Sequence, residues 1–302
     1  MQLLPSRFAA ILMLKTWFLI KNTLIAWNND YAQSMGAALA FYTMFSIAPL
    51  LLIVLSIIGF MFGEEAARGE IAGQLHSLMG EQGALAVQGL LQNVNKPAEG
   101  ALATIVGVVL LLIGATSVFG ELQSALDRIW HAPERVTAGG LFALIQSRLL
   151  SFGMILGIGF LLMVSLLLSA GLSAIGKWWS PMFNDWTLMA SMVNLAVSFA
   201  LTTMMFAMIY KLMPRVKIHW SEVWLGALIT AILFVFGKFL IGLYVGRSAV
   251  TSSFGAAGSL VVLLLWVYYS AQIFLLGAEF TWVYSNTYGS RKNERASNKR
   301  TV

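Results

Sequence analysis

The sequence YAQSMGAALAFYTMFSIAPLLLIVLSIIGFMFG, residues 31–63, contains no Asp, Glu, Lys or Arg. Four further stretches of more than twenty residues also lack these residue types: 100–120, 149–176, 186–210 and 248–278. The hydrocarbon core of a bilayer is about 30 Å thick and a helix rises about 1.5 Å per residue, so about 20 apolar residues cross it. A sixth stretch, 223–245, has that length and carries a single charge, Lys238. We therefore predict an all-α polytopic membrane protein with six transmembrane helices.

The composition also favours a membrane domain. Hydrophobic residues make up 59% of the 302 residues and charged residues only 11%, compared with about 25% charged residues in soluble domains. We expect one membrane domain over residues 1–289 and a basic, disordered cytoplasmic tail over residues 290–302. The predicted crossings are approximately 34–62, 100–120, 149–173, 187–211, 222–246 and 257–284. Cysteine is absent, which excludes disulfides, thiolate metal sites and thiol catalysis.

The segment before the first crossing mixes aromatic and aliphatic residues with Lys15, Lys21 and Asn22. This mixture is typical of an amphipathic helix that lies at the membrane surface. A terminal helix packed on the bundle is an equally good interpretation. No small-x-small cleavage site follows the segment, so we expect it to be retained.

Basic residues are unequally divided between the two sides of the predicted bundle. With the N-terminus inside, the inner side holds fourteen of the nineteen Lys and Arg residues: Arg7, Lys15, Lys21, Arg128, Arg135, Arg148, Lys211, Arg215, Lys217, Arg291, Lys292, Arg295, Lys299 and Arg300. Because cytoplasmic loops retain Lys and Arg, we expect both termini in the cytoplasm. The net charge of +6 then reflects topology and gives affinity for anionic lipid headgroups, so membrane lipids are the expected partners. Nucleic-acid binding is not favoured.

The longest outer loop, residues 64–99, contains five glutamates and apolar residues at roughly helical spacing. We predict two short amphipathic helices there, which either pack on the bundle or gate access to it. His76 has no second His or Cys nearby, so we interpret it as a surface residue.

Ionisable residues within the crossings are the first candidates for a functional site, because they are costly to place in a membrane. Glu279 follows Gln272 by one heptad near the inner end of the last crossing, so both share one helix face. Glu121 ends the second crossing at a similar depth. These residues form either structural contacts at helix ends or a polar inner vestibule that contacts a cation, a proton or a headgroup.

Lys238 lies in the outer half of the fifth crossing, where no acidic residue occupies the same leaflet within a helix. Its side chain either extends along its own stem to the interface or faces the interior, where it would bind an anionic group such as a lipid headgroup.

Flexibility and close packing are predicted at two kinds of position. Pro49 removes a helical hydrogen bond next to Tyr42 and Thr43, which makes it a hinge candidate. Small-xxx-small pairs predict close helix packing at Gly153 with Gly157 and at Gly242 with Gly246. The sequence does not fix the oligomeric state, and a homo-oligomer is compatible with these pairs.

Three stretches resemble the YihY/BrkB family of bacterial inner-membrane proteins: residues 37–50 (AALAFYTMFSIAPL), 114–130 (GATSVFGELQSALDRIW) and 255–280 (GAAGSLVVLLLWVYYSAQIFLLGAEF). The resemblance covers nearly the whole chain. It implies six helices with both ends in the cytoplasm, and it supplies no catalytic or ligand-binding residues. The family has also carried the label ribonuclease BN, which we regard as a mistaken transfer.

The residues do not favour an enzyme. The sequence has no H-x-H, H-E-x-x-H or D-x-D motif for a metal, no metal or cofactor site, and no Walker-type phosphate loop. We expect a transporter or lipid-handling protein whose substrate is an amphiphile with an anionic headgroup. The candidate path residues are Tyr42, Thr43, Glu121, Lys238, Gln272 and Glu279. The alternative is a membrane scaffold or envelope-assembly factor that recruits partners through its basic tail and outer loop.

Overall fold

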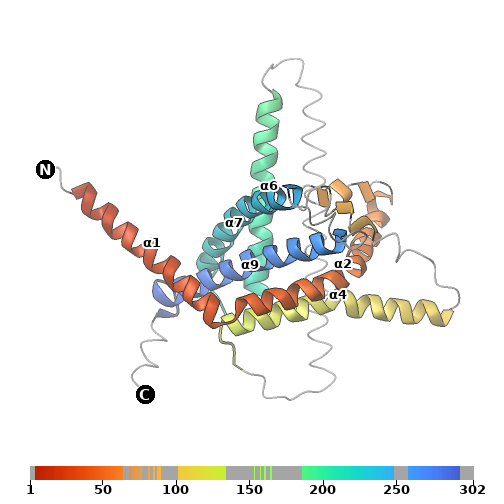
Figure 1. Cartoon of the computed structure of the whole chain (residues 1–302), viewed down its shortest axis with the longest axis horizontal. Coiled ribbons are helices and arrows are strands. Elements are labelled where there is room, and N and C mark those ends of the chain that lie inside the picture. The colour runs from red at the N-terminus through yellow and green to blue at the C-terminus, as the bar shows by residue number, and fades with distance from the viewer. Residues whose placement is uncertain are drawn as a thin grey trace.

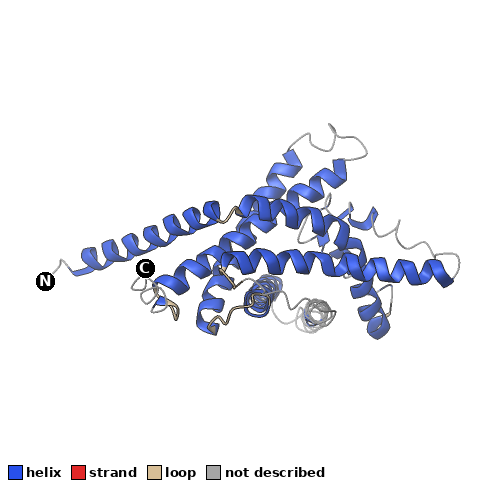
Figure 2. Ribbon diagram, turned by 90° about the horizontal axis from the view of Figure 1, so that it is seen from below, coloured by secondary structure: helices blue, strands red, loops and turns tan. Residues whose placement is uncertain are grey.

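The computed structural model describes residues 4–63, 101–133, 186–247 and 258–292, with scattered positions between 65 and 89 and positions 153, 157, 160 and 164. The prediction of an all-helical chain is confirmed for these residues, which include no strand (Figure 2). The helices are α1 (Leu4–Asn29), α2 (Ala32–Phe62), α4 (Ala101–Ile129), α6 (Trp186–Leu212), α7 (Trp220–Arg247) and α9 (Gly258–Thr287).

Four segments of the described chain are long and apolar enough to cross a membrane: Ala32–Ser56, Leu195–Leu212, Trp220–Tyr244 and Leu260–Thr287. They lie within α2, α6, α7 and α9, where the sequence predicts the first, fourth, fifth and sixth crossings. The second predicted crossing, 100–120, forms the first two thirds of α4, which is not among the four. The third, 149–173, lies outside the described residues except for four positions. The count of six therefore stays a prediction.

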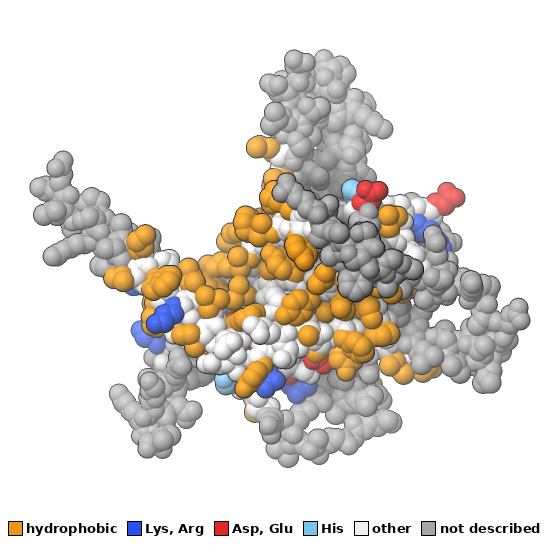
Figure 3. Space-filling view, in the orientation of Figure 1, with side chains coloured by type: hydrophobic (Ala, Val, Ile, Leu, Met, Phe, Trp, Pro, Cys, Tyr) orange, Lys and Arg blue, Asp and Glu red, His pale blue; other side chains and the backbone are white. Residues whose placement is uncertain are grey.

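The bundle is built around α9. Helix α9 packs against α2 and α7, α2 also packs against α4, and α6 packs against α7 (Figure 1). Hydrophobic side chains cover much of the central part of the face seen in Figure 3, and Lys and Arg side chains lie toward its margins. An apolar surface of this kind suits contact with lipid tails.

Helix α1 projects away from the bundle toward the N-terminus and contacts α9 (Figure 1). Its apolar side chains are largely exposed; Trp17, for example, is 65% exposed. Closer to α2, Thr23 is buried and Trp27 packs against the core. The predicted helix is present, whereas its amphipathic character and its place at the membrane surface stay predictions.

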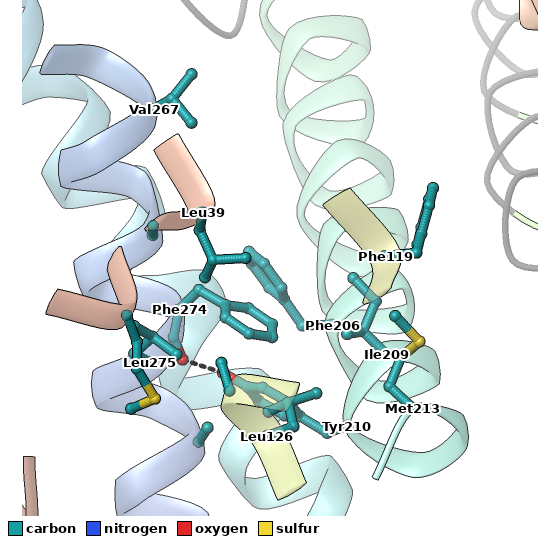
Figure 4. Packing of buried hydrophobic residues seen from close by; sticks show 14 of the residues in the cluster. Leu39, Phe119, Leu126, Phe206, Ile209, Tyr210, Met213, Val267, Phe274 and Leu275 are labelled. Atoms are coloured by element: carbon teal, nitrogen blue, oxygen red, sulfur yellow. Dashed lines mark hydrogen bonds between the residues drawn. The ribbon is translucent and has the colours of Figure 1, made fainter. Parts of the chain in front are cut away.

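The core is aromatic where α6, α7 and α9 meet (Figure 4). The Tyr210 hydroxyl donates a 2.7 Å hydrogen bond to the carbonyl of Phe274 and lies 3.0 Å from the Thr230 hydroxyl. The Phe274 ring packs against the rings of Tyr210 and Phe206. A buried tyrosine whose hydroxyl is satisfied fixes the relative positions of the three helices.

Close packing of α7 on α9 depends on glycines that the sequence analysis did not single out. A Cβ atom at Gly277 would lie 1.9 Å from the Thr230 hydroxyl oxygen, and one at Gly226 would lie 1.8 Å from that of Thr281. Each glycine therefore accommodates a threonine of the opposite helix. This arrangement brings the two backbones close together.

The predicted glycine pairs lie in different surroundings. No described atom lies within 4 Å of a Cβ built at Gly153 or Gly242. A Cβ at Gly157 would lie 3.1 Å from the end of Met208, and Gly246 lies in the last turn of α7. Close helix packing at these pairs stays a prediction.

The described positions between residues 65 and 89 are helical, in the loop that the sequence assigns to the outer side. Ile71, Leu75, Ala84 and Val87 are buried in the hydrophobic core, whereas His76 is exposed. This burial supports packing of the loop on the bundle.

Candidate functional site

Several helix ends are tied together at one end of the bundle, which we call the basic end because Lys211, Arg215 and Arg291 lie there. The Arg215 side chain forms a 3.2 Å ion pair with Asp127 of α4. The Lys211 ammonium donates a hydrogen bond to the carbonyl of Ile218. These contacts join α4 to the α6–α7 connection and give the end a fixed structure.

Glu279 is the most unusual residue near this end. It lies eight residues before the end of α9, about 12 Å along the helix, and within a candidate membrane span. Its side chain is 0% exposed, and neither carboxyl oxygen has a hydrogen-bond partner among the described residues. A buried carboxylate without a donor is strongly destabilising, so this site needs a further explanation.

The ionisable group that interacts with Glu279 is a second carboxyl, that of Asp30, which lines one pocket together with Trp282 and Val283, one turn along α9 from Glu279. Asp30 follows the last residue of α1, and Tyr31 next to it adopts a left-handed conformation with φ 58°. This turn separates α1 from α2 and leaves Asp30 beside α9. Two carboxyl groups from distant parts of the sequence therefore meet in the bundle.

Gln272 continues the polar surface one heptad from Glu279. Its amide nitrogen donates weak hydrogen bonds, 3.4 Å long, to the carbonyls of Ala32 and Gln33 at the start of α2. Its amide oxygen is buried without a partner among the described residues. A Cβ at Gly36 would lie 1.9 Å from this amide nitrogen, so glycine makes room for the side chain. We call Asp30, Gln272 and Glu279 the polar seam between α9 and the start of α2.

A pocket of about 220 Å³ lies beside the polar seam, between α1, the end of α4 and α9. Its lining is mostly polar and consists of Phe18, Asn22, Ile25, Ala26, Asn29, Asp30, His131, Trp282, Val283 and Thr287. The His131 ring stacks on Trp282 with a centroid separation of 5.2 Å. The pocket has room for several water molecules, each of which occupies about 30 Å³ in the liquid.

The other predicted path residues are not part of this seam. Tyr42 is exposed on α2 and contacts the ring of Phe41, and Thr43 and Glu121 are half-buried. Helix α2 runs without interruption through Pro49. Of the predicted path residues, Gln272 and Glu279 share one face of α9, about 10 Å apart along the helix. The functional roles of all six stay predictions.

Lys238 is half-buried on α7. It follows Ala231 by seven residues and precedes Ile241 by three, and both of these side chains are buried. Residues at these spacings share one helix face, but Val235, three residues earlier, is exposed. Lys238 therefore lies at the margin of the buried face of α7. Its neighbour Gly237 packs against Ile273 and Tyr269 of α9.

An apolar groove of about 620 Å³ lies between α6 and α7. Thr203 supplies its only polar side chain among the lining residues, which are Phe199, Ala200, Leu201, Thr203, Met204, Trp224, Leu225 and Leu228. Its lining suits hydrocarbon rather than a polar ligand.

Sequence reasoning missed Asp30, although the residue carries a signal. It is the only acidic residue among the first 63, and it follows the turn-forming pair Asn28 and Asn29. An isolated acid at a helix junction indicates a specific contact. Among the described residues, no group of three His, Asp or Glu side chains is arranged to hold a metal ion.

Comparison with known proteins agrees with the membrane architecture. The UPF0761 membrane protein of Psychrobacter sp. (strain PRwf-1) is 25% identical, with 88% of this chain and 48% of that protein aligned. The UPF0761 membrane proteins of Acinetobacter baylyi and Psychromonas ingrahamii are 23% and 27% identical, with 62% and 83% of their lengths aligned to 89% and 84% of this chain. The chain thus spans about half of the first relative and less than two thirds of the second. No solved structure matches the chain. The family described as virulence factor BrkB matches residues 23–301, and the chain belongs to this family.

Proposed function

We propose that the protein transports or redistributes an amphiphile with an anionic headgroup in the bacterial inner membrane, without an ATPase of its own. The observation that best supports this proposal is that two candidate membrane spans carry ionisable residues, Lys238 at the margin of the buried face of α7 and Glu279 fully buried on α9. Placing a charge at the bilayer centre costs about 2.5 to 3.5 kcal/mol on insertion scales. Such residues commonly line the path of a substrate or an ion.

Lys238 is the proposed contact for the headgroup. No described acidic residue forms an ion pair with it, so its ammonium is available to a phosphate or carboxylate. The register of α7 against α9 places its neighbour Gly237 beside Ile273 and Tyr269. These residues precede Glu279 by six and ten positions, about 9 to 15 Å along the helix. The cation and the carboxyl pair are therefore separate sites at different depths.

The groove between α6 and α7 supports a lipid-like substrate rather than a fully polar one. Its lining offers almost only hydrocarbon and ring surfaces, which gain free energy by covering an acyl chain. A headgroup at Lys238 and a chain along an apolar surface match the two parts of an amphiphile.

The test is lipid movement between leaflets in proteoliposomes that contain fluorescent phosphatidylglycerol. We expect Lys238→Met to lower the rate at least tenfold, because the charge is lost while the length is kept, and Lys238→Arg to retain most of it. Lys292→Met is the matched control, since it removes one positive charge at the basic end beyond α9. Equal rates for wild type and Lys238→Met would reject this residue as the headgroup site. A wild-type rate no higher than that of empty liposomes would reject lipid movement as the function.

The alternative, a scaffold that recruits partners through its basic tail, is separated by truncation. The cut belongs after Lys292, because the Ser290 N–H donates a 2.6 Å hydrogen bond to Glu222 and Arg291 lies over the Trp130 ring. A transporter keeps its flux when residues 293–302 are removed. A scaffold loses its partner.

A further inference from the structure

The polar seam contains a carboxyl pair whose chemistry the proposed lipid path does not use. Glu279 is completely buried, and both of its oxygens lack a donor among the described residues. The acidic side chain that interacts with it, Asp30, is also a carboxyl, and it lines a pocket with Trp282 and Val283, one turn along α9 from Glu279. Two facing carboxylates repel each other, and neither can donate a hydrogen bond unless one of them holds a proton.

No cation of the described residues is paired with either carboxyl. Among the described residues, no Lys or Arg forms an ion pair with Asp30 or Glu279. On the neighbouring elements, Arg128 lies over the Tyr31 ring at 5.7 Å and Lys15 over the Tyr288 ring at 5.9 Å. The start of α2, residues 32–41, contains no ionisable side chain.

The remaining titratable groups around the pair are accounted for. His131, just after the end of α4, lines the adjacent pocket, and its Nδ1–H donates a 3.0 Å hydrogen bond to the carbonyl of Ile129. Tyr210 of α6 donates its hydroxyl proton to the carbonyl of Phe274. Neither group replaces the donor that the carboxyl pair lacks.

We propose that Asp30 and Glu279 bind one proton between them and exchange it through the 220 Å³ pocket at the basic end. A shared proton makes one carboxyl a donor and the other an acceptor, which satisfies both groups in a single step. Asp30 itself lines the pocket together with Asn22, Asn29 and His131, so water in the pocket has polar partners and reaches the pair.

Among the described residues, the pocket reaches the pair from the side of Asp30. Asp30 lies in the pocket wall, whereas Glu279 lies behind it, one turn along α9 from Trp282 and Val283. A proton therefore passes from the pocket to Asp30 and then to Glu279. The charge pattern predicts that this side is the cytoplasm.

Infrared spectroscopy of the full chain in nanodiscs tests the proposal. We expect the wild type to show the carbonyl stretch of a protonated carboxyl group that shifts in heavy water and disappears as the pH is raised. Glu279→Gln should lose this band. Asp30→Asn supplies an amide donor to Glu279, so the pH at which the band disappears should fall.

The matched control is Glu222→Gln. Glu222 is a buried glutamate whose carboxylate accepts the Ser290 N–H, so its replacement should leave the band unchanged. Circular dichroism and gel filtration establish that each variant folds. If Glu279→Gln does not fold, the spectrum of Asp30→Asn tests the proposal, because the band should then disappear at a lower pH than in the wild type. A wild type without the band, or a band that persists unchanged in both pair variants, overturns the proposal.

Coupling of this proton to lipid movement is a second step that depends on the proposed function. In proteoliposomes, a pH gradient should change the wild-type rate at least threefold and leave Glu279→Gln unaffected. Loss of the infrared band without any measurable lipid movement would keep the proton site and reject transport. Lipid movement by a protein that lacks the infrared band would keep transport and reject the proton site.

Discussion

Two buried glutamates at the same end of the bundle have opposite surroundings. Glu222 is 3% exposed and lies in the first turn of α7, where its carboxylate accepts the Ser290 N–H at 2.6 Å. Glu279 is 0% exposed and faces Asp30 without a donor among the described residues. The partial positive charge of a helix N-terminus also stabilises Glu222. The two residues differ in compensation rather than in burial, and for this reason we propose a function for Glu279 and none for Glu222.

The largest expected effect separates the two glutamates by activity. Glu279→Gln should abolish the response of lipid movement to a pH gradient in proteoliposomes, because the amide cannot exchange a proton. Glu222→Gln should stay within twofold of wild type, since its amide oxygen still accepts the Ser290 N–H. Similar losses of this response of lipid movement in both variants would show that the two glutamates do not differ in function.

For the free energy of unfolding we expect the opposite order, with the larger loss on replacing Glu222. Glu222→Ala leaves the Ser290 N–H without its charged acceptor, which should cost about 1.5 to 3 kcal/mol of unfolding free energy. Glu279→Gln should be neutral or stabilising, because it replaces a facing carboxyl by a donor. Thermal unfolding in detergent compares the two variants directly. A larger loss for Glu279→Gln would indicate a structural role for that carboxyl.

The α7–α9 packing that positions Glu279 can be perturbed on its own. Gly277→Ala places a Cβ 1.9 Å from the Thr230 hydroxyl oxygen, and overpacking of this kind costs about 1 to 3 kcal/mol. Gly242→Ala, with no described atom within 4 Å, is the matched control in the neighbouring helix α7. We expect its unfolding temperature to equal or exceed that of the wild type. Equal losses in the two variants would show that Gly277 is not a close contact.

The smallest expected effect concerns Tyr210. Tyr210→Phe keeps the ring in the aromatic cluster and removes the hydrogen bonds to Phe274 and Thr230. A net loss of about 1 kcal/mol is expected for a buried hydrogen bond. Lipid movement should persist, because Tyr210 positions α9 and does not belong to the carboxyl pair. An inactive but stable variant would extend the functional site to this hydroxyl.

Sequence patterns predict much of the helical layout. The uncharged stretches beginning near residues 31 and 186 correspond to α2 and α6, because length and hydropathy decide whether a segment is helical in a membrane. Helix α4 extends to Ile129, beyond the predicted end at 120. Glu121, Asp127 and Arg128 continue the helix outside the apolar segment, where hydropathy no longer marks its end.

The site is less predictable for geometric reasons. The shared face of Gln272 and Glu279 follows from helical periodicity, and the sequence indicates it. The partner of Glu279 does not follow, because Asp30 lies about 250 positions earlier and approaches only through the turn at Tyr31. Similarly, the place of Lys238 at the margin of the buried face of α7 becomes evident only from the burial of Ala231 and the exposure of Val235.

Proton counting by potentiometric titration of the purified chain is the most direct test of the contrast between the two glutamates. The account predicts that Glu279→Gln binds one proton fewer than the wild type at neutral pH, whereas Glu222→Gln binds the same number. Equal proton counts for the wild type and Glu279→Gln would contradict it.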